Sequence, residues 1–238
     1  MAIDIHQFDI TAIRSELAEA MSAFQPECVL RISYFNEDEA FIQDLARQAY
    51  YNAPASALGM PELQVFLYPE SGQQRIVEIL LTYPDELAAL ERHKAALTRW
   101  LESLSASLGN SSGDRRLEQA ARAIASAGSY DPEGGSTVCA LMDQGSANSE
   151  GIALTMAAFC QQLGLPFRVV EGTLSGQPHF WNMVQTSSGW RHLDLTDAQS
   201  GPYNPRTDQQ MIQLGYHWDT NLVPVSGPQE EISQKAGG

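Results

Sequence analysis

Residues 145–197 constrain the fold most, because a helical pattern there is followed by three strand patterns. Apolar residues recur at helical spacing after Ser149, and the pattern stops at Gly164, a residue type common at helix C-termini. Three β-branched or alternating runs follow, at residues 167–170, 179–184 and 190–195. This order predicts an α+β fold in which a central helix packs on an antiparallel sheet.

The turn between the last two strands sets which side chains face each other. If Ser187 and Ser188 form a two-residue loop, Trp181 lies opposite Asp194. His179 then lies one diagonal away on the same face, within reach of a hydrogen bond to that carboxylate. A three-residue loop would shift the register and would need a bulge to restore the face.

The chain reads NSEGIALTMAAFCQQLGLPFRVVEG, then HFWNMV, then GWRHLDLTD. These runs resemble the transglutaminase-like superfamily, in particular its bacterial members related to papain-type cysteine proteases. The family pattern is Cys-x-Gly at a helix start, an LC…LG(I/L)P run, an HxWN strand and a W…(V/L)D.T strand. The chain matches every element except the first, over about residues 115–220. The resemblance implies a papain-like core with Ser149, His179 and Asp194 at the catalytic positions.

The chemistry that this resemblance implies is acyl transfer from a carboxamide. A cysteine at a helix N-terminus, beside an imidazolium, has a lowered pKa and attacks as the thiolate. His179 would protonate the departing ammonia, and Asp194 would orient the imidazole ring. The implied partner is a protein or peptide substrate, with no cofactor and no metal.

Serine at position 149 leaves open whether the chain is an enzyme, because a hydroxyl does not form the resting ion pair of a thiolate. Three explanations compete: a deliberate Cys-to-Ser replacement, a natural pseudoenzyme that keeps the cleft for binding, and a true serine variant. The alternative functions are a cysteine-peptidase-type hydrolase and a non-catalytic protein-interaction module. Taken alone, Ser149 could also be a simple helix N-cap.

The charge of the chain limits the classes of molecule that it is expected to bind. The formal net charge is −15 and the pI is about 4.6, which argues against a nucleic-acid or anionic-membrane surface. No signal peptide and no run of about 18 apolar residues is evident, so a soluble chain without membrane insertion is expected, its compartment open.

Cys28, Cys139 and Cys160 are too scattered for a disulfide framework or a structural zinc site. Cys160 lies on the apolar face of its helix, so we expect burial rather than a second nucleophile.

The sequence predicts three regions: an N-terminal α/β extension (1–110), the transglutaminase-like core (111–222) and a flexible tail (223–238). The extension is expected to be a helix-and-hairpin region. Its predicted elements are a helix at 10–24, a strand at 27–34, a helix around 41–49, a hairpin of 63–68 and 75–83 with its turn at 69–72, and a helix at about 85–108. In the core we expect a helix at 116–127 and a turn at 129–135.

Overall fold

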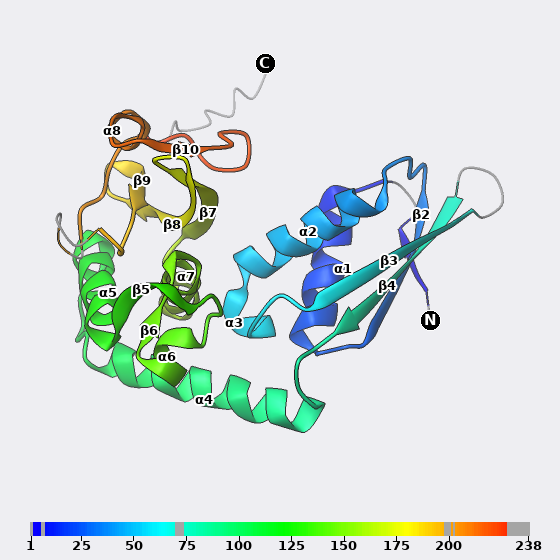
Figure 1. Ribbon diagram of the computed structural model, residues 1–238, viewed down its shortest axis with the longest axis horizontal. Coiled ribbons are helices and arrows are strands. Elements are labelled where there is room, and N and C mark those ends of the chain that lie inside the picture. The colour runs from blue at the N-terminus through cyan, green and yellow to red at the C-terminus, as the bar shows by residue number, and fades with distance from the viewer. Residues whose placement is uncertain (1, 6–7, 70–73, 198–200, 202, 228–238) are drawn as a thin grey trace, which may run out of the picture. The chain divides into compact units, whose positions relative to one another are not determined.

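The computed structural model describes residues 2–5, 8–69, 74–197, 201 and 203–227, and it has the mixed helix and sheet content expected of an α+β fold (Figure 1). The chain divides into two compact units. Unit 1 holds Met1–Ser103 and Thr137–Cys139, and unit 2 holds Leu104–Ser136 and Ala140–Gly238. Among the described residues, no helix is long and apolar enough to cross a membrane.

Unit 1 contains a four-stranded sheet in the order β1-β2-β4-β3. β1 is parallel to β2, whereas the β2–β4 and β3–β4 pairs are antiparallel. Helix α4 begins in this unit, and its last residues belong to unit 2. The elements are β1 (Ile3–Ile5), α1 (Ile10–Ser22), β2 (Glu27–Ser33), α2 (Glu39–Asn52), α3 (Pro54–Ala57), β3 (Glu62–Pro69), β4 (Gln74–Thr82) and α4 (Leu87–Ala106).

The predicted helices and hairpin of the extension are confirmed. α1 buries Ile13, Leu17 and Met21, the residues whose spacing predicted it, and Asp9 caps its first turn by accepting a backbone hydrogen bond. β3 and β4 pair as the expected hairpin, although residues 70–73 of its turn lie outside the described residues. β1 was not predicted, because three residues are too few for a clear period.

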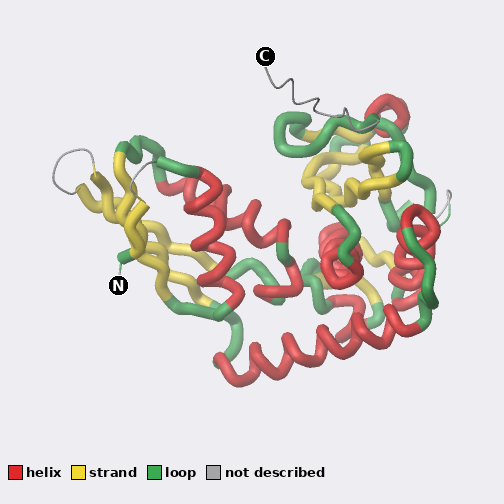
Figure 2. Tube along the Cα trace, turned by 180° about the vertical axis from the view of Figure 1, so that it is seen from behind, coloured by secondary structure: helices red, strands yellow, loops and turns green. Residues whose placement is uncertain are grey.

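Unit 2 is built around a second four-stranded sheet, in the order β10-β7-β8-β9, with every neighbouring pair antiparallel. Figure 2 shows this sheet from behind, in yellow. The elements that begin in this unit are α5 (Gly113–Ala127), β5 (Ser129–Gly135), α6 (Ala140–Gln144), β6 (Ser146–Ala147), α7 (Ser149–Leu163), β7 (Phe167–Leu174), β8 (Gln177–Thr186), β9 (Gly189–Leu193), α8 (Asp208–Gln213) and β10 (Tyr216–Trp218).

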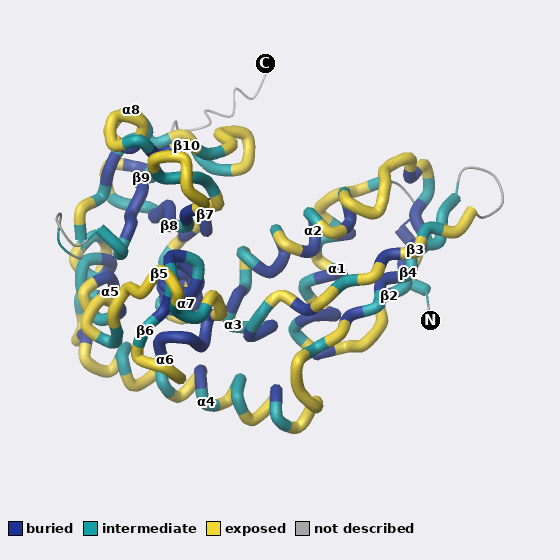
Figure 3. The backbone as a smooth tube through the Cα atoms, in the orientation of Figure 1, coloured by how far each residue is buried: buried dark blue, intermediate teal, exposed yellow. Residues whose placement is uncertain are grey.

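Helix α7 is the central helix of unit 2, and Figure 3 shows it largely buried. A helix that is apolar all round must be covered on every side. On one face of the sheet, the Asn182 amide donates to the Ala153 carbonyl of α7 at 2.9 Å. On the other face, alternate residues of β8 join an apolar cluster made of Val170, Trp181, Met183, Met211 and Tyr216. The predicted central helix packed on an antiparallel sheet is therefore confirmed.

The β8–β9 hairpin has the two-residue loop on which the predicted register depends. Thr186 pairs with Gly189, and Asn182 pairs with Leu193. The same register carried one residue further sets Trp181 opposite Asp194.

The turn expected at residues 129–135 lies inside a strand that the sequence did not predict, because the chain folds back between Tyr130 and Gly135, which both lie opposite Ala147. These residues form β5, which pairs in parallel with the short β6 across a register shift. A Cβ added to Gly134 would lie 2.9 Å from the Ala147 carbonyl carbon. The absence of a side chain at Gly134 therefore allows the backbones of the two strands to lie close together. The glycines and proline of this segment suggested a turn because local turn chemistry does not reveal a distant pairing partner.

We expect Gly172→Ala to destabilise unit 2 by about 1–3 kcal/mol, because a Cβ there would lie 2.3 Å from the His217 carbonyl oxygen and 2.7 Å from the Trp181 ring. Urea unfolding followed by tryptophan fluorescence measures this change. Gly227→Ala is the matched control, since nothing lies within 4 Å of its added Cβ, and it should change stability by less than about 0.5 kcal/mol. Equal effects of the two substitutions would contradict the close packing at Gly172.

Candidate active site

Ser149 lies at the first position of α7, as the sequence predicted. Asn148 is the N-cap, and its side-chain oxygen accepts the Gly151 N–H at 3.0 Å. Among the described residues, the Ser149 N–H has no hydrogen-bond partner, as is usual in the first turn of a helix. This N–H is therefore available to bind a negatively charged oxygen.

His179 and Asp194 meet as the predicted register requires. The His179 Nε2 lies 2.7 Å from an Asp194 carboxylate oxygen, and both residues are 5% exposed. A carboxylate at this distance from Nε2 binds a proton on that nitrogen, which leaves Nδ1 as the basic atom of the neutral ring. Among the described residues, Nδ1 has no hydrogen-bond partner.

Two further side chains hold the Asp194 carboxylate, and the sequence did not predict either role. Tyr216, on β10, donates its hydroxyl to the same oxygen as His179, at 2.7 Å. Thr196 donates both its N–H and its hydroxyl to the other oxygen, each at 2.8 Å. Thr196 belongs to the LDLTD run and could have been suspected, whereas Tyr216 is 22 residues away from Asp194 and gave no signal.

These contacts determine how the two acids ionise. Burial alone raises the pKa of Asp194, but the hydrogen bond and charge of His179, with hydrogen bonds from Thr196 and Tyr216, lower that pKa below its ordinary value. Burial and the nearby Asp194 charge both raise the pKa of the Tyr216 phenol. Asp194 is therefore the anion of the site, and Tyr216 stays protonated as a donor.

Ser149 is joined to the strand that carries His179 through the backbone. The Phe180 N–H donates to the Ser149 hydroxyl oxygen at 3.3 Å. Among the described residues, no hydrogen bond joins this hydroxyl to the His179 ring. The three predicted residues are thus gathered at one end of β8, but the serine is not hydrogen-bonded to the imidazole.

A pocket of about 420 Å³ opens at this site and could admit a peptide side chain. Ser149 is 9% exposed and is not among the lining residues. The pocket is lined by Tyr130, Leu174, Gln177, Pro178, His179, Thr196, Asp197 and Tyr216.

The cysteines offer no alternative nucleophile beside His179. None of the three forms a disulfide. Cys160 is fully buried, as predicted, and burial raises the pKa of its thiol to about 12. Burial, together with nearby glutamates, raises the pKa of Cys28 to about 11. Both thiols are therefore protonated and unreactive near neutral pH.

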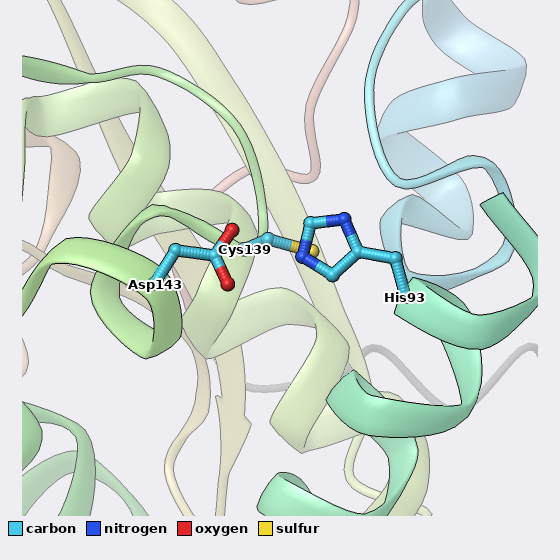
Figure 4. A group of neighbouring side chains, drawn as sticks. All are labelled: His93, Cys139 and Asp143. Carbon is cyan, nitrogen blue, oxygen red and sulfur yellow. The ribbon is translucent and has the colours of Figure 1, made fainter. Parts of the chain in front are cut away.

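Figure 4 shows the third cysteine, Cys139, which is buried directly before α6. The same view shows Asp143, exposed on α6, and His93 on α4. His93 belongs to unit 1 and Asp143 to unit 2, so we assign no shared site to them.

Comparison with known families identifies the segment that carries this geometry. Residues 102–195 match the model of the transglutaminase-like superfamily. The match includes Ser149, His179 and Asp194, and with the α+β arrangement of unit 2 it confirms the predicted transglutaminase-like fold. No curated protein matches the chain significantly.

Solved structures give weaker likenesses. A TGase crystal structure is 17% identical, with a TM-score of 0.42, and the match covers 80% of this chain and 57% of that one. A candidate cysteine protease from Cytophaga hutchinsonii is 10% identical, with a TM-score of 0.38 and coverage of 57% and 62%. A candidate protease from Parabacteroides distasonis ATCC 8503 is 11% identical, with a TM-score of 0.35 and coverage of 71% and 41%. The chain thus spans less than two thirds of each, and at these scores the likenesses support no further conclusion.

We expect Tyr216→Phe to raise the pKa of Asp194, because the carboxylate loses one of its donors. A pKa that is lower in the folded than in the unfolded chain stabilises the fold above about pH 4, and this stabilisation is lost as the pH falls through the folded pKa. The variant should therefore lose about 1.5–3 kcal/mol of stability near neutral pH, and the smaller remainder should be fully lost at a higher pH than in the parent. Carboxyl NMR titration and urea unfolding measure the two quantities.

Tyr130→Phe is the control, since Tyr130 is 43% exposed and lines the same pocket. It should leave the Asp194 titration unchanged. An Asp194 pKa that is the same in Tyr216→Phe as in the parent would show that the Tyr216 hydroxyl does not stabilise the carboxylate.

Proposed function

We propose that residues 111–222 form a transglutaminase-like acyl-transfer core in which Ser149 occupies the position of the nucleophilic cysteine. The main support is the buried 2.7 Å contact between His179 and Asp194, at the strand whose Phe180 N–H binds the Ser149 hydroxyl. A helix N-terminus, an imidazole and a buried carboxylate are the parts that such a site needs. The match over residues 102–195 supports the same assignment.

With sulfur at position 149, these parts would transfer an acyl group. The thiolate would attack the carbonyl carbon of a peptide carboxamide, and the N–H of residue 149 would stabilise the resulting oxyanion. His179 would give its proton to the departing amide nitrogen, releasing ammonia and leaving a thioester. An amine or water would then attack the thioester, with the ring taking its proton.

With serine, the same site lacks an activated nucleophile. An alkoxide is not stabilised by the interactions that stabilise a thiolate, so His179 would have to remove the hydroxyl proton during attack. The Ser149 oxygen instead accepts the Phe180 N–H. We propose that the chain binds a protein or peptide carboxamide at this site and transfers its acyl group slowly or not at all.

The test is to restore the thiol by Ser149→Cys and to measure its alkylation by iodoacetamide as a function of pH. We expect labelling of the introduced thiol to persist at about pH 6, because the imidazole and the helix N-terminus favour the thiolate. Mass spectrometry of the labelled peptides assigns the site. Cys28 and Cys160 are internal references, since burial raises the pKa of each thiol and neither should label at that pH.

Two variants serve as controls for this experiment. Ser149→Cys combined with His179→Gln should label as an ordinary thiol, with a pKa of about 8.5. Ser188→Cys introduces an exposed thiol in the β8–β9 turn of the same unit, which should also behave as an ordinary thiol. Labelling in Ser149→Cys that matches Ser188→Cys and does not depend on His179 would contradict the triad and favour a non-catalytic interaction module.

The same variant separates the two possible reactions. We expect Ser149→Cys to release ammonia from a glutamine-containing peptide and to incorporate a primary amine into it. Ammonia release without amine incorporation would identify a hydrolase of the cysteine-peptidase type instead. Ammonia detection and mass spectrometry of the peptide measure the two products.

A further inference from the structure

A second histidine–aspartate pair lies one side chain away from His179. His192, on β9, is fully buried, and its Nε2 lies 2.9 Å from an Asp208 carboxylate oxygen. Its Nδ1 accepts the indole N–H of Trp181 at 2.8 Å. The Trp181 indole in turn stacks on the His179 imidazole, with ring centroids 6.2 Å apart and an angle of 25° between the planes. A continuous path of contacts thus joins the two histidines.

The hydrogen bonds determine the protonation state of His192. An indole nitrogen can only donate, so the Nδ1 that binds Trp181 must be an unprotonated acceptor. The proton of the neutral ring is therefore on Nε2, directed at Asp208. Burial lowers the pKa of His192, opposed by the hydrogen bond and charge of Asp208. A proton added at Nδ1 would face the Trp181 N–H, so the neutral ring is the form that bridges the two partners.

Asp208, at the end of this path away from His179, is held by hydrogen bonds to Ser226. Asp208, the first residue of α8, donates its N–H to the Ser226 hydroxyl at 2.7 Å. Its two carboxylate oxygens accept the Ser226 N–H at 3.2 and 3.3 Å. The His192 and Arg206 backbones also exchange two hydrogen bonds of 2.8 Å. His192 is thus held through its ring and through its main chain.

Trp181 contacts both aromatic partners of the Asp194 carboxylate. Besides stacking on His179, its ring meets the Tyr216 ring edge-on, with centroids 5.2 Å apart and an angle of 75° between the planes. Trp181 is 1% exposed, and its indole N–H requires a partner at that depth. Rotation of the indole would therefore break a buried hydrogen bond and displace both rings that bind Asp194.

We propose that His192, anchored by Asp208, is a positioning residue that fixes the Trp181 indole and thereby aims His179 and Tyr216 at the Asp194 carboxylate. His192 acts only through Trp181, and the proposal gives it no direct contact with the substrate. Its significance for acyl transfer rests on the proposed function. The geometry that it controls can be measured without any reaction.

The direct test uses the chain that carries Ser149 and follows the Asp194 carboxyl by NMR titration. In His192→Leu, we expect the pKa of Asp194 to rise, because His179 and Tyr216 are no longer held against the carboxylate. His192→Gln should restore the parent titration, since its amide can accept from the indole and donate to Asp208. An unchanged Asp194 titration in folded His192→Leu would overturn the proposal.

The second test adds these substitutions to Ser149→Cys and measures iodoacetamide labelling against pH. We expect His192→Leu to slow labelling at about pH 6 by roughly tenfold, which corresponds to a rise of about one unit in the thiol pKa. His192→Gln should keep the parent profile, and a profile unchanged by His192→Leu would overturn the proposal.

Asp208→Ala keeps the His192 ring but removes the carboxylate that binds its Nε2. This variant replaces His192→Leu in both tests if His192→Leu does not fold. It should change both measurements in the same direction as His192→Leu, and two unchanged measurements would overturn the proposal. If Ser149→Cys itself shows no labelling at about pH 6, the proposed function fails. The Asp194 titration still decides the role of His192 in that case.

Discussion

The buried carboxylate of Asp194 is the interaction on which the site of unit 2 depends. A buried charge is costly unless it is paired and hydrogen-bonded. His179, Thr196 and Tyr216 supply the donors, from β8, from the segment after β9, and from β10. The charge of Asp194 is therefore stabilised only when these three segments of the chain lie next to its carboxylate. The same donors lower the pKa of Asp194, so the geometry of the site and its ionisation have one cause.

The parts of this site that the sequence predicted are those with short-range causes. The central helix follows from a cap at Asn148, an apolar period and a left-handed Gly164 at its end. The approach of His179 to Asp194 follows from the period of two along each strand and from a two-residue loop, which together set the register. Each of these features lies within one helix or one hairpin: α7 is 15 residues long, and His179 and Asp194 are 15 residues apart.

The parts that the sequence did not predict depend on distant pairing. Tyr216 reaches Asp194 because β10 pairs with β7, which precedes it in the chain by more than forty residues, and no local pattern announces that partner. The same is true of β5, whose glycines suggest a turn although they permit close approach to β6. The bridge from Trp181 through His192 to Asp208 requires three elements to be placed before any contact can be inferred. Local chemistry therefore predicted the components, and tertiary pairing decided how they are held.

Nitrogen-15 NMR of the His179 ring, in the chain that carries Ser149, tests this arrangement most directly. If the Asp194 carboxylate orients the ring, His179 carries a proton on Nε2, bound to Asp194, and an unprotonated Nδ1 when the ring is neutral. The Nε2 proton should be protected from exchange with solvent, and Asp194→Asn should remove that protection. A neutral ring with its proton on Nδ1, or an Nε2 proton that exchanges freely in the parent chain, would contradict the claim that the buried carboxylate organises the site.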